Sequence, residues 1–209
     1  MATLVIDGHP NPDSLTAALA RRYTDGHGEA TLLAVRDLDF DPSMRFGYTR
    51  HQELERDLRD AWEALTAADH VVLMTPVWWN SVPALLKGFF DRILLPREAY
   101  RYRRSGLPEG LLTGRTGRVV VTTDSPWWWL RLVERDSTVR NVRHSTLGFC
   151  GISPIKATRL GPVRTSSPAK RERWLARVED LGRADAASRP TRRQPALSIH
   201  RTSSPSRSS

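Results

Sequence analysis

The sequence predicts an α/β fold in which a parallel β-sheet is covered by helices on both faces. Short apolar runs, typical of strands buried on both sides, alternate along the chain with segments whose apolar residues recur at helical spacing. Over a chain of 209 residues, this alternation predicts one α/β domain of ordinary size.

Five strands and the helices between them can be assigned in order. The apolar runs predict strands over residues 3–8, 30–38, 70–75, 117–123 and 154–161. The helical patterns predict a helix beginning near Leu15 and further helices over 50–67, 81–94, part of 127–148, and 167–182. Asp13 or Ser14 is expected to cap the first helix. Ser166 or Ser167 is expected to cap the last helix, and Gly182 to end it.

The domain is expected to span residues 1–182, followed by a basic tail over 183–209. The tail contains six arginines and one acidic residue, and it is rich in serine and proline. It has too few apolar residues to offset the entropy of ordering, so we expect it to be disordered and solvated. The alternative is a weak contact with a polyanion or a membrane surface. Because this tail carries +5 of the net charge of +9 and the other 182 residues carry only +4, we do not expect the domain to bind nucleic acid.

The chain has no feature that predicts export or membrane insertion. No basic start followed by a long apolar run is present, and no window approaches the roughly 18–20 apolar residues of a membrane helix. The single cysteine, Cys150, cannot form an internal disulfide and is expected to be a buried structural thiol. These features favour a cytoplasmic protein.

Three loops follow the carboxyl ends of predicted strands, where parallel sheets bind ligands. The first, HPNPDS, leads into a helix start with the hydroxyls of Ser14 and Thr16, and its free backbone N–H groups suit one phosphate. It contains neither G-x-G-x-x-G nor a Walker lysine. A plain helix cap, with His9 as an ordinary loop residue, is the alternative.

The second and third loops are rich in tryptophan. In PVWWNS, Trp78 and Trp79 could wall a flat aromatic ligand while the backbone around Val77–Asn80 meets its polar edge. The alternative is that both tryptophans close the core or form a dimer contact. Pro83 is expected in the first turn of the next helix. The third loop, TTDSPWWW, offers the hydroxyl and carboxylate groups of residues 122–125.

One phosphate site beside one aromatic slot matches flavin mononucleotide (FMN) better than it matches a nucleoside triphosphate. The sequence contains no H-E-x-x-H, C-x-x-C or G-x-S-x-G motif, so it gives no sign of zinc-dependent, dithiol or serine-hydrolase chemistry, and no metal site is expected.

With these motifs in place, residues 3–182 resemble the flavodoxin-like NAD(P)H:quinone oxidoreductase and NAD(P)H-dependent FMN reductase family. HPNPDSLTAAL is similar to the family's first flavin-phosphate loop, and PVWWNSVPALLKGFFDRIL to its long P-[LV]-x-W-x-x-x-P-A-x-L-K-G signature. The resemblance implies a doubly wound sheet of five parallel strands in the order 2-1-3-4-5.

The resemblance also implies the site and its chemistry. The expected FMN-binding residues are His9, Ser14, Leu15, Thr16, Pro76, Val77, Trp78, Trp79, Asn80, Thr122, Thr123 and Asp124. NADPH or NADH is the implied co-substrate, and FAD also occurs in the family. The implied reaction is ping-pong transfer of a hydride through the flavin to a quinone or a similar small acceptor. The implied assembly is a homodimer.

Two features depart from the family pattern. Where many members have T-T-G-G, this chain has TTDSP, so a bulkier acidic loop stands beside the expected nicotinamide pocket. The asparagine that is usual in the first loop is Thr16 here.

Two other functions compete with the enzyme. The first is a flavodoxin-like binding or regulatory subunit that docks on a membrane transporter, because a fold alone does not decide function. The second is a flavodoxin-like electron carrier. The net positive charge of the chain argues against it, because such carriers are commonly acidic. Residues 97–114 are expected to be a solvated loop, or alternatively a cap over a partner subunit's site.

Overall fold

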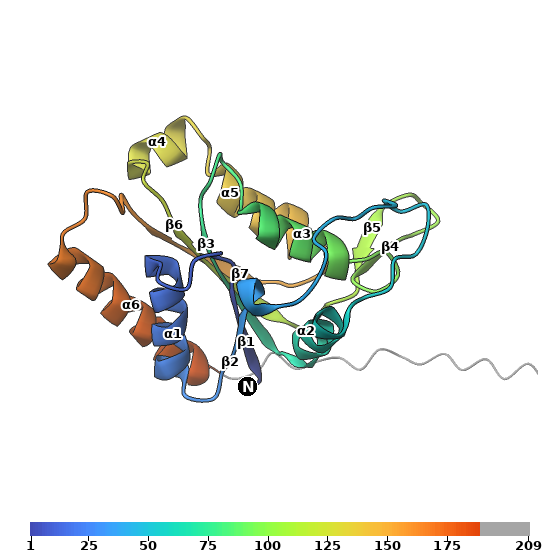
Figure 1. The fold of residues 1–209 in the computed structure, drawn as a ribbon, viewed down its shortest axis with the longest axis horizontal. Helices are drawn as coiled ribbons and strands as arrows, with labels where there is room; N and C mark the ends of the chain where they lie inside the picture. The colour runs from blue at the N-terminus through green and yellow to red at the C-terminus, as the bar shows by residue number, and fades with distance from the viewer. Residues whose placement is uncertain (189–209) are drawn as a thin grey trace, which may run out of the picture.

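The computed structural model describes residues 1–188, except for the side chains of Trp127 and Arg131. Its main sheet has five parallel strands in the order β2-β1-β3-β6-β7 (Figure 1), which confirms the predicted order 2-1-3-4-5. These strands are β1 (Thr3–Asp7), β2 (Thr31–Ala34), β3 (His70–Pro76), β6 (Thr116–Thr122) and β7 (Ile155–Leu160).

Helices cover both faces of this sheet (Figure 1). One face carries α1 (Leu15–His27) and α6 (Pro168–Ala186). The other carries α2 (Arg56–Ala67), α3 (Ala84–Ile93) and α5 (Ser137–Arg140). Successive side chains of a strand point to opposite faces of the sheet. The strands therefore contribute side chains to two separate apolar cores, one on each face.

The predicted second strand is shorter than expected, because an ion pair turns the chain. A 3₁₀ turn, Val35–Asp37, follows β2 directly. Within it, Arg36 donates to the Asp7 carboxylate at 2.5 Å and to the His9 carbonyl at 3.0 Å. These bonds pull residues 35–37 towards the end of β1, so they leave the strand direction.

The second helix begins at Arg56, six residues later than predicted. The buried guanidinium of Arg92 accounts for the difference. It donates to the Glu53 carbonyl at 2.9 Å, to the Glu55 carboxylate at 2.8 Å and to the Asp41 carbonyl at 2.5 Å. Arg92 thereby holds the segment before the helix in a non-helical path.

The prediction that Gly182 ends the last helix was wrong, since α6 continues to Ala186. The glycine serves close packing instead. A Cβ at Gly182 would lie 2.3 Å from the Tyr23 carbonyl oxygen, and one at Gly26 would lie 2.2 Å from the Glu179 carbonyl oxygen. Ser167 caps this helix, as one of the two predicted alternatives. Most of the predicted tail, residues 189–209, lies outside the described residues.

The extra turn of α6 places Asp185 under the amino end of the sheet, where it is 3% exposed. Arg118 donates to both its carboxylate oxygens, at 2.6 and 2.9 Å, and Tyr23 Oη donates at 2.7 Å. His70 Nε2 lies 3.5 Å from the same carboxylate. Burial alone would raise the pKa of Asp185, but these partners outweigh burial and hold it far below its usual range.

Two other segments differ from the predictions. The single helix expected within 127–148 is divided into α4 (Trp127–Leu132), α5 and a π-helical stretch, Asn141–Thr146. Residues 97–114 were expected to be a loop but contain an antiparallel hairpin of β4 (Tyr100–Tyr102) and β5 (Pro108–Gly110).

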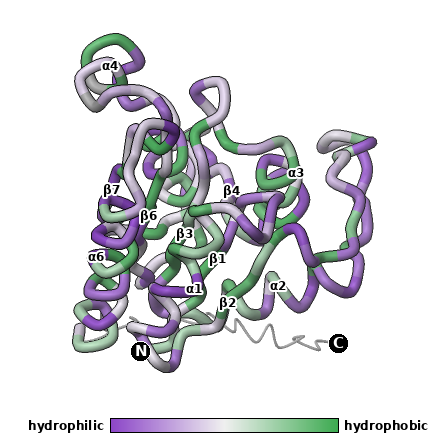
Figure 2. Tube along the Cα trace, turned by 60° about the vertical axis from the view of Figure 1, so that its left-hand side comes forward, coloured by the Kyte–Doolittle hydropathy of each residue, from purple (hydrophilic) through white to green (hydrophobic). Residues whose placement is uncertain are grey.

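Helix α4 stands apart from the rest of the molecule, and Figure 2 shows apolar residues on it. The exposed apolar side chains on α4 and just after it are Trp128, Trp129, Leu132 and Val133. Among residues 1–188, no helix combines the length and the apolar character needed to cross a membrane.

Candidate functional site

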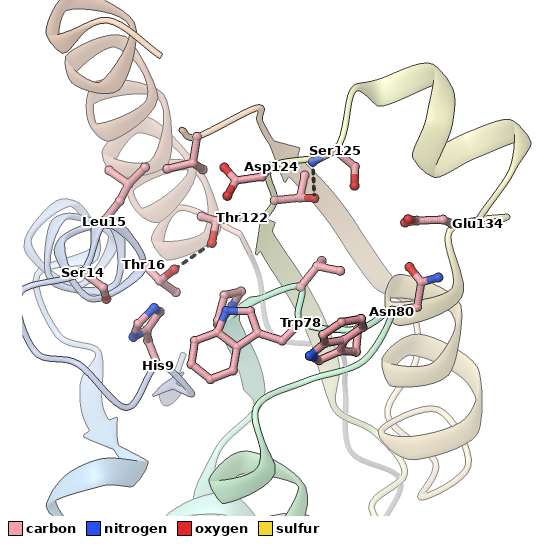
Figure 3. A pocket seen from close by; sticks show the side chains of 15 residues that line it. His9, Ser14, Leu15, Thr16, Trp78, Asn80, Thr122, Asp124, Ser125 and Glu134 are labelled. Carbon is pink, nitrogen blue, oxygen red and sulfur yellow. Dashed lines mark hydrogen bonds between the residues drawn. The ribbon is translucent and has the colours of Figure 1, made fainter. Parts of the chain in front are cut away.

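A cavity of about 520 Å³ opens at the carboxyl ends of the central strands. All twelve residues expected from the sequence line it: His9, Ser14, Leu15, Thr16, Pro76, Val77, Trp78, Trp79, Asn80, Thr122, Thr123 and Asp124. They come from the last residues of β3 and β6 and from the segments that follow β1, β3 and β6, and Figure 3 shows the labelled ones around one space. The fold therefore brings the three predicted loops together around one space.

The first loop ends in a capped helix whose first N–H groups are free. Ser14 is the N-cap of α1, and its hydroxyl accepts from the Ala17 N–H at 3.1 Å. Among the described residues, the N–H groups of Leu15 and Thr16 have no acceptor, as is usual in a first helical turn. This end of the cavity offers two backbone donors and the positive end of the helix dipole.

Thr16, one of the two departures noted in the sequence, ties this helix to the sheet. Its hydroxyl shares a 2.8 Å hydrogen bond with the hydroxyl of Thr122 at the end of β6. Both side chains are buried. The bond fixes the start of α1 against the third loop and so sets the depth of the cavity there.

His9 is held by its own loop while its ring faces the cavity. The Asn11 N–H donates to His9 Nδ1 at 3.0 Å, which leaves the Nε2–H of the neutral ring as a donor. Burial lowers the pKa of His9, and the Arg36 charge acts in the same direction, whereas Asp7 opposes them. The ring also packs edge-on against Trp78, with centroids 5.6 Å apart.

The second loop is a tight two-residue turn. Trp78 and Ser81 exchange two backbone hydrogen bonds of 2.9 Å, and the residues between them have positive φ: 51° for Trp79 and 55° for Asn80. Such turns favour asparagine or glycine, so a tryptophan here is strained. Trp79 is 100% exposed. A strained turn that leaves this side chain uncovered is typical of a ligand site rather than of core packing.

The third loop is linked to the loop after β7. Asp124 accepts the Arg164 N–H at 2.6 Å, and Thr123 Oγ1 accepts the Ser125 N–H at 3.1 Å. Asp124 is exposed towards the cavity (Figure 3). The TTDSP sequence therefore leaves the cavity open and places a carboxylate on its rim.

Two lining residues, Glu134 and Val163, were not expected from the sequence, whereas Ser125 belongs to the third loop that the sequence identified. Val163 follows β7, and its position at the same edge of the sheet was the signal that could have identified it. Glu134 reaches the cavity because the chain breaks after α4, with positive φ at Arg135 (49°) and Asp136 (57°). Neither residue is a glycine, so the sequence gives no sign of this break.

The single cysteine, Cys150, does not line the cavity. Cys150 is buried, as predicted, and burial raises the pKa of its thiol to about 11. Among the described residues, no group of histidine, cysteine or acidic side chains is arranged to hold a metal ion.

Comparison with known proteins places the chain among flavodoxin-like proteins. The family model described as the flavodoxin-like fold matches residues 1–181. A human protein named ribosyldihydronicotinamide dehydrogenase [quinone] is 33% identical over 142 residues, which are 66% of this chain and 60% of that protein. The chain thus spans less than two thirds of that relative's length.

A bacterial relative and a solved structure agree with this result. The FMN-dependent NADH:quinone oxidoreductase of Cereibacter sphaeroides is 29% identical over 154 residues, covering 68% of this chain and 76% of that protein. The crystal structure of Smu.1420 from Streptococcus mutans UA159 superposes with a TM-score of 0.78 at 28% identity, covering 88% of this chain and all of that one. The chain belongs to the flavodoxin-like family and is similar to these quinone oxidoreductases.

Proposed function

We propose that this protein is an FMN-dependent NAD(P)H oxidoreductase that reduces a quinone or a similar small acceptor by a ping-pong reaction. The net reaction is NAD(P)H + H⁺ + quinone → NAD(P)⁺ + hydroquinone, in which two electrons pass from the nicotinamide to the acceptor. FMN, when bound, would supply the hydride chemistry between the two substrates. FAD is the alternative cofactor.

One observation carries the proposal: a single cavity joins an unpaired helix N-terminus to exposed tryptophans at the switch between β1 and β3. The free N–H groups of Leu15 and Thr16, with Ser14, would hold the FMN phosphate. The walls formed by Trp78 and Trp79 suit the flat ring system. The donors and walls present therefore fit this cofactor.

The protein's own groups would bind and orient the ligands. The His9 Nε2–H would donate to the phosphate or to the chain that follows it, because Nδ1 is already occupied by Asn11. Thr123 also lines the cavity. The indole rings of Trp78 and Trp79 would exclude water from one side of the ring system.

The assembly and location belong to the same proposal. A homodimer would cover apolar side chains that the single chain leaves exposed, among them Trp128, Trp129 and Leu132. A cytoplasmic location matches the single buried thiol and a supply of reduced nicotinamide. We expect neither nucleic-acid binding nor stable membrane insertion.

Steady-state turnover tests the proposed function. The full chain, supplied with FMN, should oxidise NADPH or NADH rapidly when a neutral naphthoquinone is added, and initial rates at varied concentrations of both substrates should give the parallel double-reciprocal lines of a ping-pong reaction. If the protein binds FMN but does not turn over with quinone, nitro or azo acceptors, the enzyme hypothesis is wrong. The docking-subunit hypothesis would then replace it.

A further inference from the structure

Two carboxylates stand on the lining of the cavity. Of the described residues that line the cavity, Asp124 and Glu134 are acidic, and none is a lysine or an arginine. They come from different elements: Asp124 follows β6, and Glu134 follows α4. Figure 3 shows Glu134 beside Asn80, on the side of the cavity away from α1, and Asp124 near Thr122.

Neutral donors hold both carboxylates in place. Asp124 accepts the Arg164 backbone N–H at 2.6 Å, and Glu134 accepts the indole N–H of Trp129 at 3.0 Å. The Asn80 amide nitrogen, in the orientation that satisfies both groups, donates to the Glu134 oxygens at 2.6 and 3.3 Å. Among the described side chains, neither carboxylate has an ion-pair partner.

The lining of the cavity consequently carries groups of opposite electrostatic character. The start of α1 presents free N–H groups and the positive end of a helix dipole, which favour an anion. Asp124 and Glu134 add two negative charges to the rest of the lining, and the exposed rings of Trp78 and Trp79 have faces that also favour cations. A molecule entering beside Glu134 and Asp124 therefore meets two charges that repel an anion.

We propose that Asp124 and Glu134 set the charge preference for the acceptor, so that the site accepts neutral or cationic aromatic acceptors and rejects anionic ones. This inference rests on the proposed function and adds the substrate class to it. The two residues act by long-range charge and are specificity residues. Because they are partly solvated, we expect each to change the preference about three- to tenfold. The effect should weaken at high salt, where charges beyond roughly 10 Å are screened.

The test compares three acceptors built on one naphthoquinone ring: the neutral quinone, its sulfonate and a trimethylammonium derivative. With the FMN-loaded full chain, kcat/KM for the sulfonate should be at least tenfold lower than for the neutral quinone at low salt, and the trimethylammonium derivative should match or exceed the neutral quinone. Raising the salt concentration should bring the kcat/KM for the sulfonate closer to that for the neutral quinone. The ratio of sulfonate to neutral kcat/KM should rise about three- to tenfold in Asp124→Asn and in Glu134→Gln.

Asp180→Asn is the matched control, because it removes one negative charge from an exposed site on α6 and should leave the ratio unchanged. Equal reduction of the sulfonate and the neutral quinone by the unmodified chain would overturn the charge preference. A ratio that stays constant in both rim variants would overturn the assignment to Asp124 and Glu134. Absence of turnover with the neutral quinone would instead contradict the proposed function, so the two failures are distinguishable.

Discussion

The polar groups at the two ends of the parallel sheet differ in whether they have partners within the protein. At the amino end, Asp185, Arg118, Tyr23 and His70 are buried, and Asp185 contacts the other three. At the carboxyl end, Asp124 and Glu134 have no ionic partner within residues 1–188, and N–H groups at the start of α1 have no acceptor there.

The exposed aromatic residues follow the same division. Trp78 and Trp79 stand uncovered at the carboxyl end, in a turn with two positive φ values. Buried polar groups that hydrogen-bond or ion-pair with one another stabilise a fold. Groups around a cavity that lack an ionic partner or an acceptor remain available to a ligand. The comparison therefore assigns stability to one end of the sheet and binding to the other.

The largest expected effect lies at the amino end. Asp185→Asn leaves the buried guanidinium of Arg118 without its ionic partner, so we expect the free energy of unfolding to fall by about 3–5 kcal/mol. The control Asp180→Asn, one turn earlier on α6, removes only an exposed pair with Arg183 and should cost less than about 1 kcal/mol. Urea denaturation of both variants measures the difference.

The low pKa of Asp185 adds a pH dependence to this effect. Because its folded pKa lies below the unfolded value of about 3.9, its contribution is fully present above that pH and is lost as the pH falls further. The gap in stability between the unmodified chain and Asp185→Asn should therefore narrow below about pH 4. A gap that stays constant down to pH 2 would contradict the charged network.

The second effect lies at the carboxyl end and concerns binding. Trp78 and Trp128 are matched, since they are 45% and 47% exposed, but only Trp78 lines the cavity. Trp78→Ala should weaken FMN binding about tenfold or more, because stacking on an aromatic ring contributes about 1 kcal/mol beyond buried area. Trp128→Ala should leave the dissociation constant unchanged. Equal effects in fluorescence titrations would contradict the placement of the ring system.

The third effect distinguishes the helix-capping role of Ser14 from its proposed role in binding the FMN phosphate. Ser14 and Ser167 cap α1 and α6 in the same way, each accepting an N–H three residues on. Substituting either with alanine should lower the free energy of unfolding by about 1 kcal/mol. Only Ser14→Ala should also weaken FMN binding, and the affinity for riboflavin, which has no phosphate, should change less. Thermal melts and flavin titrations of both variants supply the two readouts.

The smallest effect is a change of stability near neutral pH. His27 is buried, and both its ring nitrogens lack hydrogen-bond partners among the described residues. Burial lowers its pKa, and the chain's amino terminus and His70 act in the same direction, while Asp185 and Glu29 oppose them.

A folded pKa below the unfolded value means that stability is present above about pH 6.5 and is lost as the pH falls through it. Stability measured by denaturation should therefore fall less between pH 7.5 and 5.5 in His27→Phe than in the unmodified chain. His51→Gln, at an exposed position, should keep the original slope. If His27→Phe also keeps the original slope, His27 is not the group that titrates.

The sequence predicted the binding end of the sheet better than the amino end. The loops after the first, third and fourth strands were identified because apolar runs locate strands, and the carboxyl ends of parallel strands meet at one edge. Glu134 was missed because the turn that directly follows it depends on positive φ at Arg135 and Asp136, and no glycine marks that turn.

Asp185 was missed because Gly182 was interpreted as a helix end and the following residues as part of a solvated tail. One signal for it was present. Arg118 stands inside an otherwise apolar strand, and a buried arginine requires a buried acid. Its partner lies 67 residues further along the chain, so local patterns could not identify it.

The central claim is that the carboxyl-end cavity binds FMN, with its phosphate at the start of α1. The direct test is an equilibrium titration of the purified full chain with FMN and, in parallel, with riboflavin, followed by anaerobic addition of NADPH or NADH. The account predicts saturation at one FMN per chain, weaker binding of riboflavin, and bleaching of the flavin absorbance by the reduced nicotinamide. Failure to bind either flavin, or equal affinity for both, would contradict it.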